Sequence, residues 1–144
     1  MLVPDSHLSY QITVRVNPAD IDELDHVNNA VYLRWVQEAA IAHWRAIASP
    51  QMQADTLWVV LRHEIDYKAP ALAADHLIVT TWIGTATRLT FTRHTQIDRA
   101  GGSAGASPVL LAKALTLWCP LDAQSRRPKR VDAALRSLFA AKEE

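Results

Sequence analysis

Residues 20–29 gather the side chains of acid–base and acyl-transfer chemistry in one short segment. Four carboxylates and one imidazole stand there, on Asp20, Asp22, Glu23, Asp25 and His26. A helix is expected to follow, and its first N–H groups lack internal partners while its dipole favours negative charge. A carboxylate that faces a carbonyl polarised by such groups can attack it or activate a water molecule. This pattern indicates acyl transfer without a metal or cofactor, with Asp22 as the first candidate for the reacting group.

The same side chains have simpler interpretations as caps and solvated loop residues, which are common ahead of a helix. Asp20 suits a turn and Asn28 suits a helix cap. Two roles are possible for His26: it orients the loop or the substrate, or it hydrogen-bonds the backbone. A calcium loop that starts at Asp20 would need glycine and glutamate where the sequence has Asp25 and Val31. The other histidines lack the spacing of a zinc site, so we expect no metal.

A strand and a long helix are predicted on either side of this acidic segment. Apolar and polar residues alternate over residues 10–16, which is typical of a strand with one buried face. Beyond the segment, Arg34 and Glu38 are spaced for an ion pair on the polar side of a helix. The apolar side of that helix recurs at Val31, Trp35, Ala39, Ala42 and Ala46. We expect about five turns, closed by Ser49 and Pro50.

The rest of the chain predicts an antiparallel sheet. Strand-like runs occupy residues 57–69, 76–86, 88–99 and 108–121, and apolar residues at helical spacing predict a short helix at 131–139. The glycine-rich segment 100–107 is expected to be a mobile hairpin loop. The order indicates a single α+β domain over residues 1–144, with one helix on one face of the sheet. Pairing with a second subunit would cover the open edges, so we expect at least a homodimer.

Composition limits the classes of partner. Fifteen Lys and Arg residues balance fifteen Asp and Glu residues, so no general attraction to nucleic acid or anionic membrane is expected. No run of about 18 apolar residues is present, and no membrane span is predicted. The single Cys119 lies in an apolar run, which favours a buried thiol and a cytoplasmic location. Trp58, Trp82 and Trp118 lie in strands and are assigned to the core, although one could line an acyl pocket.

Two motifs carry a family resemblance. They are DxDxxDHVNNxxYLxW over residues 20–35, and DYKAP over residues 66–70 with an aspartate at 75. Together they resemble the hotdog-fold acyl-CoA thioesterases of the 4-hydroxybenzoyl-CoA thioesterase class. The resemblance covers nearly the whole chain. It implies a five-stranded antiparallel sheet wrapped around a long central helix, with a short C-terminal helix. It also implies two subunits whose sheets join edge to edge, with active sites at their interface.

The resemblance implies roles for individual residues. The catalytic carboxylate of the family is the second aspartate of DxD, which is Asp22 here, and the carbonyl-polarising amide lies near Asn29. His26 matches the histidine of plant acyl-carrier-protein thioesterases of related fold, whose asparagine is replaced here by Leu24. Asp25 stands where the bacterial pattern usually has glycine. Aspartate enters the left-handed region more readily than most residues, so we expect the fold to tolerate it.

We therefore expect an enzyme that hydrolyses acyl-CoA thioesters to a free acid and coenzyme A. Asp22 acts as nucleophile or general base, His26 and Asn29 complete the site, and no cofactor is needed because coenzyme A belongs to the substrate. A basic run could hold its phosphates, although a solvated loop is the simpler interpretation. This run comprises Arg126, Arg127, Lys129 and Arg130. A homodimer or a homotetramer built from two dimers is expected. The alternatives are a non-catalytic acyl-ligand binding dimer and a thioesterase that acts on acyl carrier protein.

Overall fold

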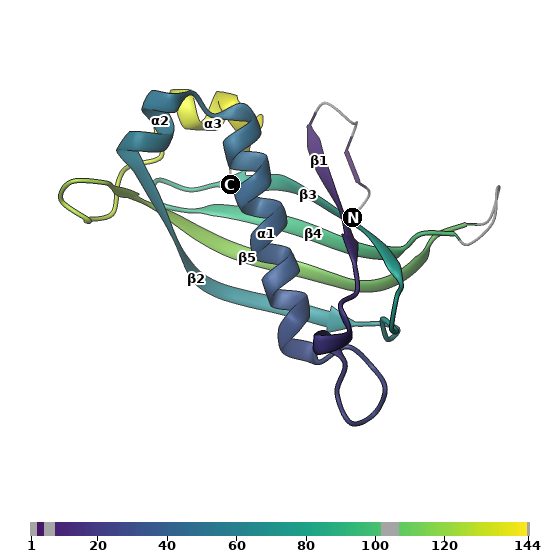
Figure 1. Ribbon diagram of the computed structural model, residues 1–144. Helices are drawn as coiled ribbons and strands as arrows, with labels where there is room; N and C mark the ends of the chain where they lie inside the picture. Colours follow the sequence, from purple (N-terminus) through teal and green to yellow (C-terminus); the bar gives the residue numbers. More distant parts are fainter. Residues whose placement is uncertain (1–2, 5–7, 102–106, 144) are drawn as a thin grey trace.

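The computed structural model describes residues 3–4, 8–101 and 107–143. The elements are β1 (Ser9–Arg15), a 3-10 turn (Pro18–Asp20), α1 (Asn29–Ile47), α2 (Pro50–Asp55), β2 (Thr56–Tyr67), β3 (His76–Ala86), β4 (Phe91–Arg99), β5 (Val109–Asp122), α3 (Ala133–Phe139) and β6 (Lys142–Glu143). Five strands form an antiparallel sheet in the order β1-β3-β4-β5-β2, and the short β6 pairs in parallel with β3. Figure 1 shows α1 crossing one face of the curved sheet, with α2 and α3 near its C-terminal end. The predicted α+β architecture is confirmed.

Helix α1 begins at a cap and buries one side against the sheet. The side chain of Asn28 accepts a hydrogen bond from the backbone N–H of Ala30 at 3.0 Å, as expected for a capping residue. The predicted buried stripe is right at Trp35 and Ala39 but wrong at Ala46, which is exposed. The buried side of α1 also includes Tyr32 and His43, which were not among the apolar residues used for the prediction. Its buried residues are Tyr32, Trp35, Val36, Ala39, Ala40 and His43.

A second helix follows α1 where the sequence predicted only a stop. The hydroxyl of Ser49 accepts a hydrogen bond from the backbone N–H of Met52 at 3.1 Å, and Pro50 stands at the first position of α2. Serine as cap followed by proline is a favoured way to begin a helix. The Ser-Pro pair therefore starts α2, and α1 ends before it at Ile47.

Strand β2 is an edge strand whose exposed face carries apolar residues. It pairs with β5 from Thr56 opposite Asp122 to Tyr67 opposite Ala112, with a bulge between Val60 and Arg62. A bulge shifts the inward and outward alternation by one residue. The outward residues are Leu57 and Val59 before the bulge and Leu61 within it, with 37%, 37% and 57% of their surface exposed. The strand-like run predicted at 57–69 is therefore one strand that contains a bulge.

The glycine-rich segment separates β4 from β5, and these two strands pair with each other as predicted. Residues 102–106 of that segment lie outside the described residues. The predicted C-terminal helix is confirmed as α3, whose N-cap is Asp132. Leu135 and Phe139 of α3 are buried together with Val131, in a second cluster beyond the C-terminal half of α1.

A small polar cluster is buried between α1 and the sheet. The Arg93 guanidinium of β4 donates through Nη1 to Nδ1 of His43 at 3.0 Å and to Oγ1 of Thr81 at 2.9 Å. Burial, and to a lesser extent the charge of Arg93, lowers the pKa of His43 from 6.5 to about 3. His43 is therefore neutral at ordinary pH, with Nδ1 as the acceptor and Nε2 carrying the proton.

Acid should weaken the fold through His43. Because its pKa is lowered in the folded protein, the unfolded chain binds a proton between pH 6.5 and about 3 that the native protein does not bind. This stability is complete above pH 6.5 and is lost toward pH 3, at up to about 1.4 kcal/mol per pH unit. His43→Gln keeps an acceptor for Arg93 but cannot bind this proton. Its free energy of unfolding should therefore depend less steeply on pH between pH 6.5 and about 3. Urea unfolding at several pH values measures the difference, and equal slopes for both proteins would contradict it.

Tyr32 joins the start of α1 to the loop after β2. Its hydroxyl accepts a hydrogen bond from the backbone N–H of Ala71 at 2.9 Å, and both residues are buried. Its ring contacts those of Trp35 and Tyr67 edge-on, with centroids 5.2 and 5.1 Å apart. The hydroxyl of Tyr67 in turn donates to the carbonyl of Asn29 at 3.1 Å. These contacts hold the N-terminal end of α1 beside the C-terminal end of β2.

Removing the Tyr32 hydroxyl should lower stability without changing the fold. In Tyr32→Phe the ring contacts remain, but the buried N–H of Ala71 loses its acceptor. The free energy of unfolding should fall by about 1–3 kcal/mol, as measured by urea denaturation. Tyr10→Phe is the control, because no hydrogen bond of the Tyr10 hydroxyl is found within the described chain. Equal losses in the two variants would refute this role of the hydroxyl.

Candidate active site

The acidic segment forms a closed loop directly ahead of α1, at the foot of the helix in Figure 1. An isolated bridge pairs Ile21 with Val27, and the N–H of Asp22 donates to the carbonyl of His26 at 2.8 Å. The N–H of Asn28 donates to the carbonyl of Asp20 at 2.9 Å. The predicted residues Asp22, His26 and Asn29 are thus brought together at one end of the fold.

Asp20 has a structural role, as the sequence predicted. Only 6% of its surface is exposed, and both of its oxygens accept hydrogen bonds from Nη2 of Arg34, at 3.1 and 3.2 Å. It also accepts a bond from the backbone N–H of Asn17, which closes the 3-10 turn before the loop. A buried carboxylate with these partners is occupied by the scaffold and is not free to meet a substrate.

Asp22 is held differently. One oxygen, Oδ1, accepts the N–H of Leu24 at 2.8 Å and the N–H of His26 at 3.4 Å. Within the described chain no partner is found for Oδ2, and the residue is half-buried. Asp25 makes the tight turn possible, because its φ of 60° is left-handed, as the glycine replacement suggested. The loop thus orients the Asp22 carboxylate through one oxygen and leaves the other available.

The first turn of α1 offers a hydrogen-bond donor next to this loop. The N–H of Ala30 is used by the Asn28 side chain and that of Val31 by the Asn28 carbonyl. In the described chain the N–H of Asn29 has no acceptor, and its position at the positive end of the helix dipole suits a polarised carbonyl oxygen. The His26 side chain is exposed, and no hydrogen bond of its ring is found among the described residues.

The basic run lies far from this loop within one subunit. Arg126, Arg127 and Arg130 are exposed, whereas Nζ of Lys129 donates to Oγ1 of Thr56 at 3.1 Å. Thr56 is the first residue of β2, and the acidic loop lies beside the last residue, Tyr67. Since a strand rises about 3.3 Å per residue, the two ends of β2 are roughly 35 Å apart. A single subunit therefore does not join the predicted phosphate contacts to the predicted reaction site.

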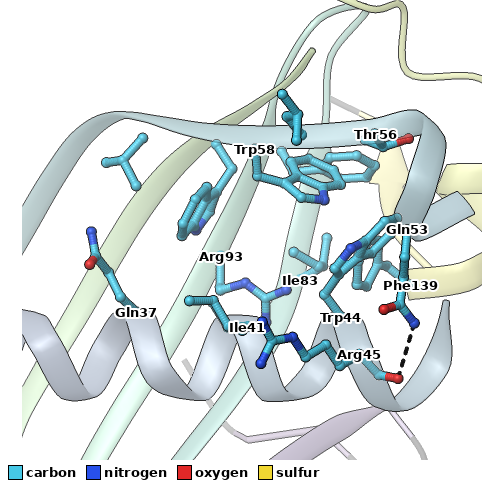
Figure 2. Close-up of a pocket in the computed structure, with 15 residues that line it drawn as sticks. Gln37, Ile41, Trp44, Arg45, Gln53, Thr56, Trp58, Ile83, Arg93 and Phe139 are labelled. Carbon is cyan, nitrogen blue, oxygen red and sulfur yellow. Dashed lines mark hydrogen bonds between the residues drawn. The ribbon is translucent and has the colours of Figure 1, made fainter. Parts of the chain in front are cut away.

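A cavity of about 560 Å³ lies between the C-terminal half of α1, the start of β2 and α3. Figure 2 shows the side chains that line it, with Arg93 reaching into the space between α1 and the strands. Two of the tryptophans assigned to the core, Trp58 and Trp118, line this cavity. The third, Trp82, is buried and stacks on His94, with ring centroids 5.4 Å apart.

Arg93 was not predicted as a functional residue, although its position in the sequence carried a signal. In β4 the buried residues Phe91, Arg93, Thr95 and Ile97 alternate with less buried polar ones. An arginine in phase with Phe91 and Ile97 must therefore point toward the core. A charged residue on the buried face of a strand is rare and commonly marks a specific partner or ligand.

No group of three His, Cys, Asp or Glu side chains among the described residues is arranged to hold a metal ion. None of the helices within the same residues has the length and apolar character needed to cross a bilayer.

The fold is shared with solved thioesterases. The 1,4-dihydroxy-2-naphthoyl-CoA thioesterase from Synechocystis is 23% identical and matches 92% of this chain and 96% of its own, with a TM-score of 0.74. A 4-hydroxybenzoyl-CoA thioesterase mutant, complexed with 4-hydroxybenzoyl-CoA, is 18% identical over 91% and 98% of the two chains, with a TM-score of 0.79. The Dynemicin thioesterase is 20% identical over 94% and 98%, with a TM-score of 0.79.

No curated protein sequence matches the chain. At the level of sequence families, the model of the Thioesterase-like superfamily matches residues 16–139, which include the acidic loop, α1 and all strands of the sheet except β1 and β6. The chain therefore belongs to the Thioesterase-like superfamily, and the prediction of a hotdog-fold thioesterase is confirmed.

Proposed function

We propose that the protein hydrolyses acyl-CoA thioesters to a free acid and coenzyme A, with Asp22 as the reacting carboxylate. The observation that carries this proposal is the difference between the carboxylates of the acidic loop. Asp20 is buried and bound by Arg34, whereas Asp22 is oriented by the loop through Oδ1 and keeps Oδ2 free of partners among the described residues. The proposal agrees with the acyl-CoA substrates named for two of the proteins of similar fold.

In the proposed reaction, the protein acts on both the oxygen and the carbon of the thioester carbonyl. Its oxygen would accept the N–H of Asn29, where the α1 dipole stabilises the negative charge that develops during attack. Asp22 then attacks the carbonyl carbon, or it takes a proton from a water molecule that attacks. In either route the C–S bond breaks and coenzyme A leaves as a thiolate. In the first route, water hydrolyses the resulting anhydride. His26 would contact the substrate from the exposed side of the loop.

The proposal includes a homodimer joined along β2. This strand forms an edge of the sheet, is twelve residues long and exposes apolar side chains, and such edges commonly pair with another chain. Antiparallel pairing of two β2 strands about a two-fold axis would bring the Thr56 end of one subunit beside the Tyr67 end of its partner. The basic run of one subunit would then lie near the acidic loop of the other and could hold the phosphates of coenzyme A. Association of two dimers and a cytoplasmic location stay predictions.

Loss of the Asp22 carboxylate should abolish turnover and preserve the fold. In Asp22→Asn, release of free thiol from acyl-CoA thioesters should fall by at least about a hundredfold, the range expected for a general base or nucleophile. Circular dichroism and thermal melting should match the wild type. Glu23→Gln is the matched control, because Glu23 is an exposed neighbour in the same loop. Wild-type turnover by Asp22→Asn would exclude this mechanism.

A charge on the β2 edge should separate the subunits. Leu61 lies at the bulge near the middle of β2, so Leu61→Lys would place two ammonium groups close to the proposed two-fold axis. Sedimentation velocity should show a dimer for the wild type and a monomer for the variant, with a parallel loss of turnover. Val109→Lys changes an equally apolar, exposed residue of β5 and should remain dimeric. A dimeric Leu61→Lys protein would overturn the β2 interface.

A further inference from the structure

Arg93 is a buried charge without a negative partner. Only 4% of its surface is exposed, and no Asp or Glu side chain in the described residues forms an ion pair with it. Its neighbours are neutral: Nδ1 of His43, Oγ1 of Thr81, and the ring of Phe139 at 5.6 Å. An isolated buried charge is costly unless an opposite charge or hydrogen bonds compensate it. The described residues therefore give this interior positive charge hydrogen bonds but no opposite charge.

The guanidinium also keeps unused donors. The hydrogen bonds of Arg93 to His43 and Thr81 are both made by Nη1. In the described chain no acceptor is found for Nε or Nη2. Burial lowers the pKa of Arg93 to about 9, so the group is still charged at neutral pH. Nε and Nη2 form one edge of the planar guanidinium, which matches the two oxygens of a carboxylate.

The cavity beside Arg93 has the other properties of a ligand site. Its volume of about 560 Å³ lies in the usual range for small-molecule pockets. Aromatic rings form much of its wall, from Trp44, Trp58, Phe91, Trp118 and Phe139. In Figure 2 the indole of Trp58 lies across the cavity from α1, with Arg93 between them.

Two tryptophans of this wall have unpaired hydrogen-bond donors. The buried indole N–H groups of Trp58 and Trp118 have no partner in the described structure. The lining contains no acidic residue and includes a second arginine, Arg45, which is exposed at the rim. A buried cation and two unpaired N–H groups around one cavity favour an occupant that supplies acceptor oxygens and negative charge.

We propose that this cavity receives the acyl group of a thioester whose far end carries a carboxylate, and that Arg93 selects for that carboxylate. The aromatic walls would hold the flat or apolar middle of the acyl group, and Nε and Nη2 of Arg93 would bind the two terminal oxygens. This inference rests on the proposed thioesterase function. In the β2 dimer, the Thr56–Val60 half of β2 faces the acidic loop of the partner subunit. The thioester carbonyl would therefore react at one subunit while its acyl group enters the cavity of the other.

Matched pairs of substrates test the selection. One pair is 4-carboxybenzoyl-CoA and 4-methylbenzoyl-CoA, and the other is adipoyl-CoA and hexanoyl-CoA. For the wild type, kcat/KM should favour the carboxylated member of each pair by about tenfold or more, as expected for a charged hydrogen-bonded pair. Arg93→Met should lose this preference, and Arg15→Met, which removes an exposed charge on β1, should keep it. No preference in the wild type, or an unchanged preference in Arg93→Met, would overturn the inference.

A second variant guards against loss of folding. Arg93→Lys keeps the positive charge but lacks the planar pair of donors, so its preference should be reduced without disappearing. Thermal melting identifies which variants are folded. If Arg93→Met does not fold, an undiminished preference in folded Arg93→Lys would count against the inference, and a reduced preference would support it.

Binding separates this inference from the proposed function. Calorimetry of the same four thioesters with Asp22→Asn should show tighter binding of the carboxylated members, and the difference should vanish in Asp22→Asn/Arg93→Met. Turnover that requires Asp22 but shows no carboxylate preference would leave the proposed function intact and overturn the role of Arg93. Selective binding that depends on Arg93, with no turnover of any thioester by the wild type, would support the cavity assignment and overturn the hydrolase.

Discussion

The ion pair between Asp20 and Arg34 is the contact on which the proposed reaction site depends. It joins the turn before the acidic loop to the second turn of α1 and is nearly buried on the Asp20 side. The carbonyl of the same aspartate accepts the N–H of the cap residue Asn28, so one residue holds both ends of the loop. The two charged side chains and this backbone hydrogen bond thereby keep the loop against the helix. Without them, the carboxylate of Asp22 would have no defined position relative to the amides of α1.

The three aspartates of the acidic loop have different roles because they differ in burial and in hydrogen-bond partners. Asp20, Asp22 and Asp25 lie within six residues, yet each has a different role. Asp20 forms a salt bridge, Asp22 keeps one carboxylate oxygen without a partner among the described residues, and Asp25 adopts a left-handed turn. The arrangement is economical because each backbone constraint that closes the loop also orients Asp22. The Tyr32 and Tyr67 contacts extend the same constraint to β2, so the start of the helix is joined to the end of the edge strand. This coupling would make the site sensitive to any contact between β2 strands.

The opposite end of α1 has a different character. There the helix buries His43, and the sheet presents Arg93 and Thr81 to it, so the core contains a polar cluster among aromatic rings. Burial, and to a lesser extent the charge of Arg93, lowers the pKa of the histidine to about 3. An anionic group in the adjacent cavity would compensate the buried charge of Arg93. The fold would then place bond cleavage at one end of the helix and acyl recognition at the other, joined through the dimer.

The sequence alone determined the local features: the strand alternation, the length of α1, the cap at Asn28 and the motif that singled out Asp22. These depend on residues a few positions apart, whose periodicity and chemistry can be read directly. It placed the end of α1 correctly before Ser49 and Pro50 but missed α2 and the bulge in β2, because a helix stop and a helix start share the same residues and a bulge leaves no periodic signal. Only the tertiary structure decided that Asp20 is occupied by Arg34 and that Arg93 has no acidic partner in the described residues. Both facts depend on which strands and helices meet across long distances in the chain, and that is set by packing rather than by local pattern.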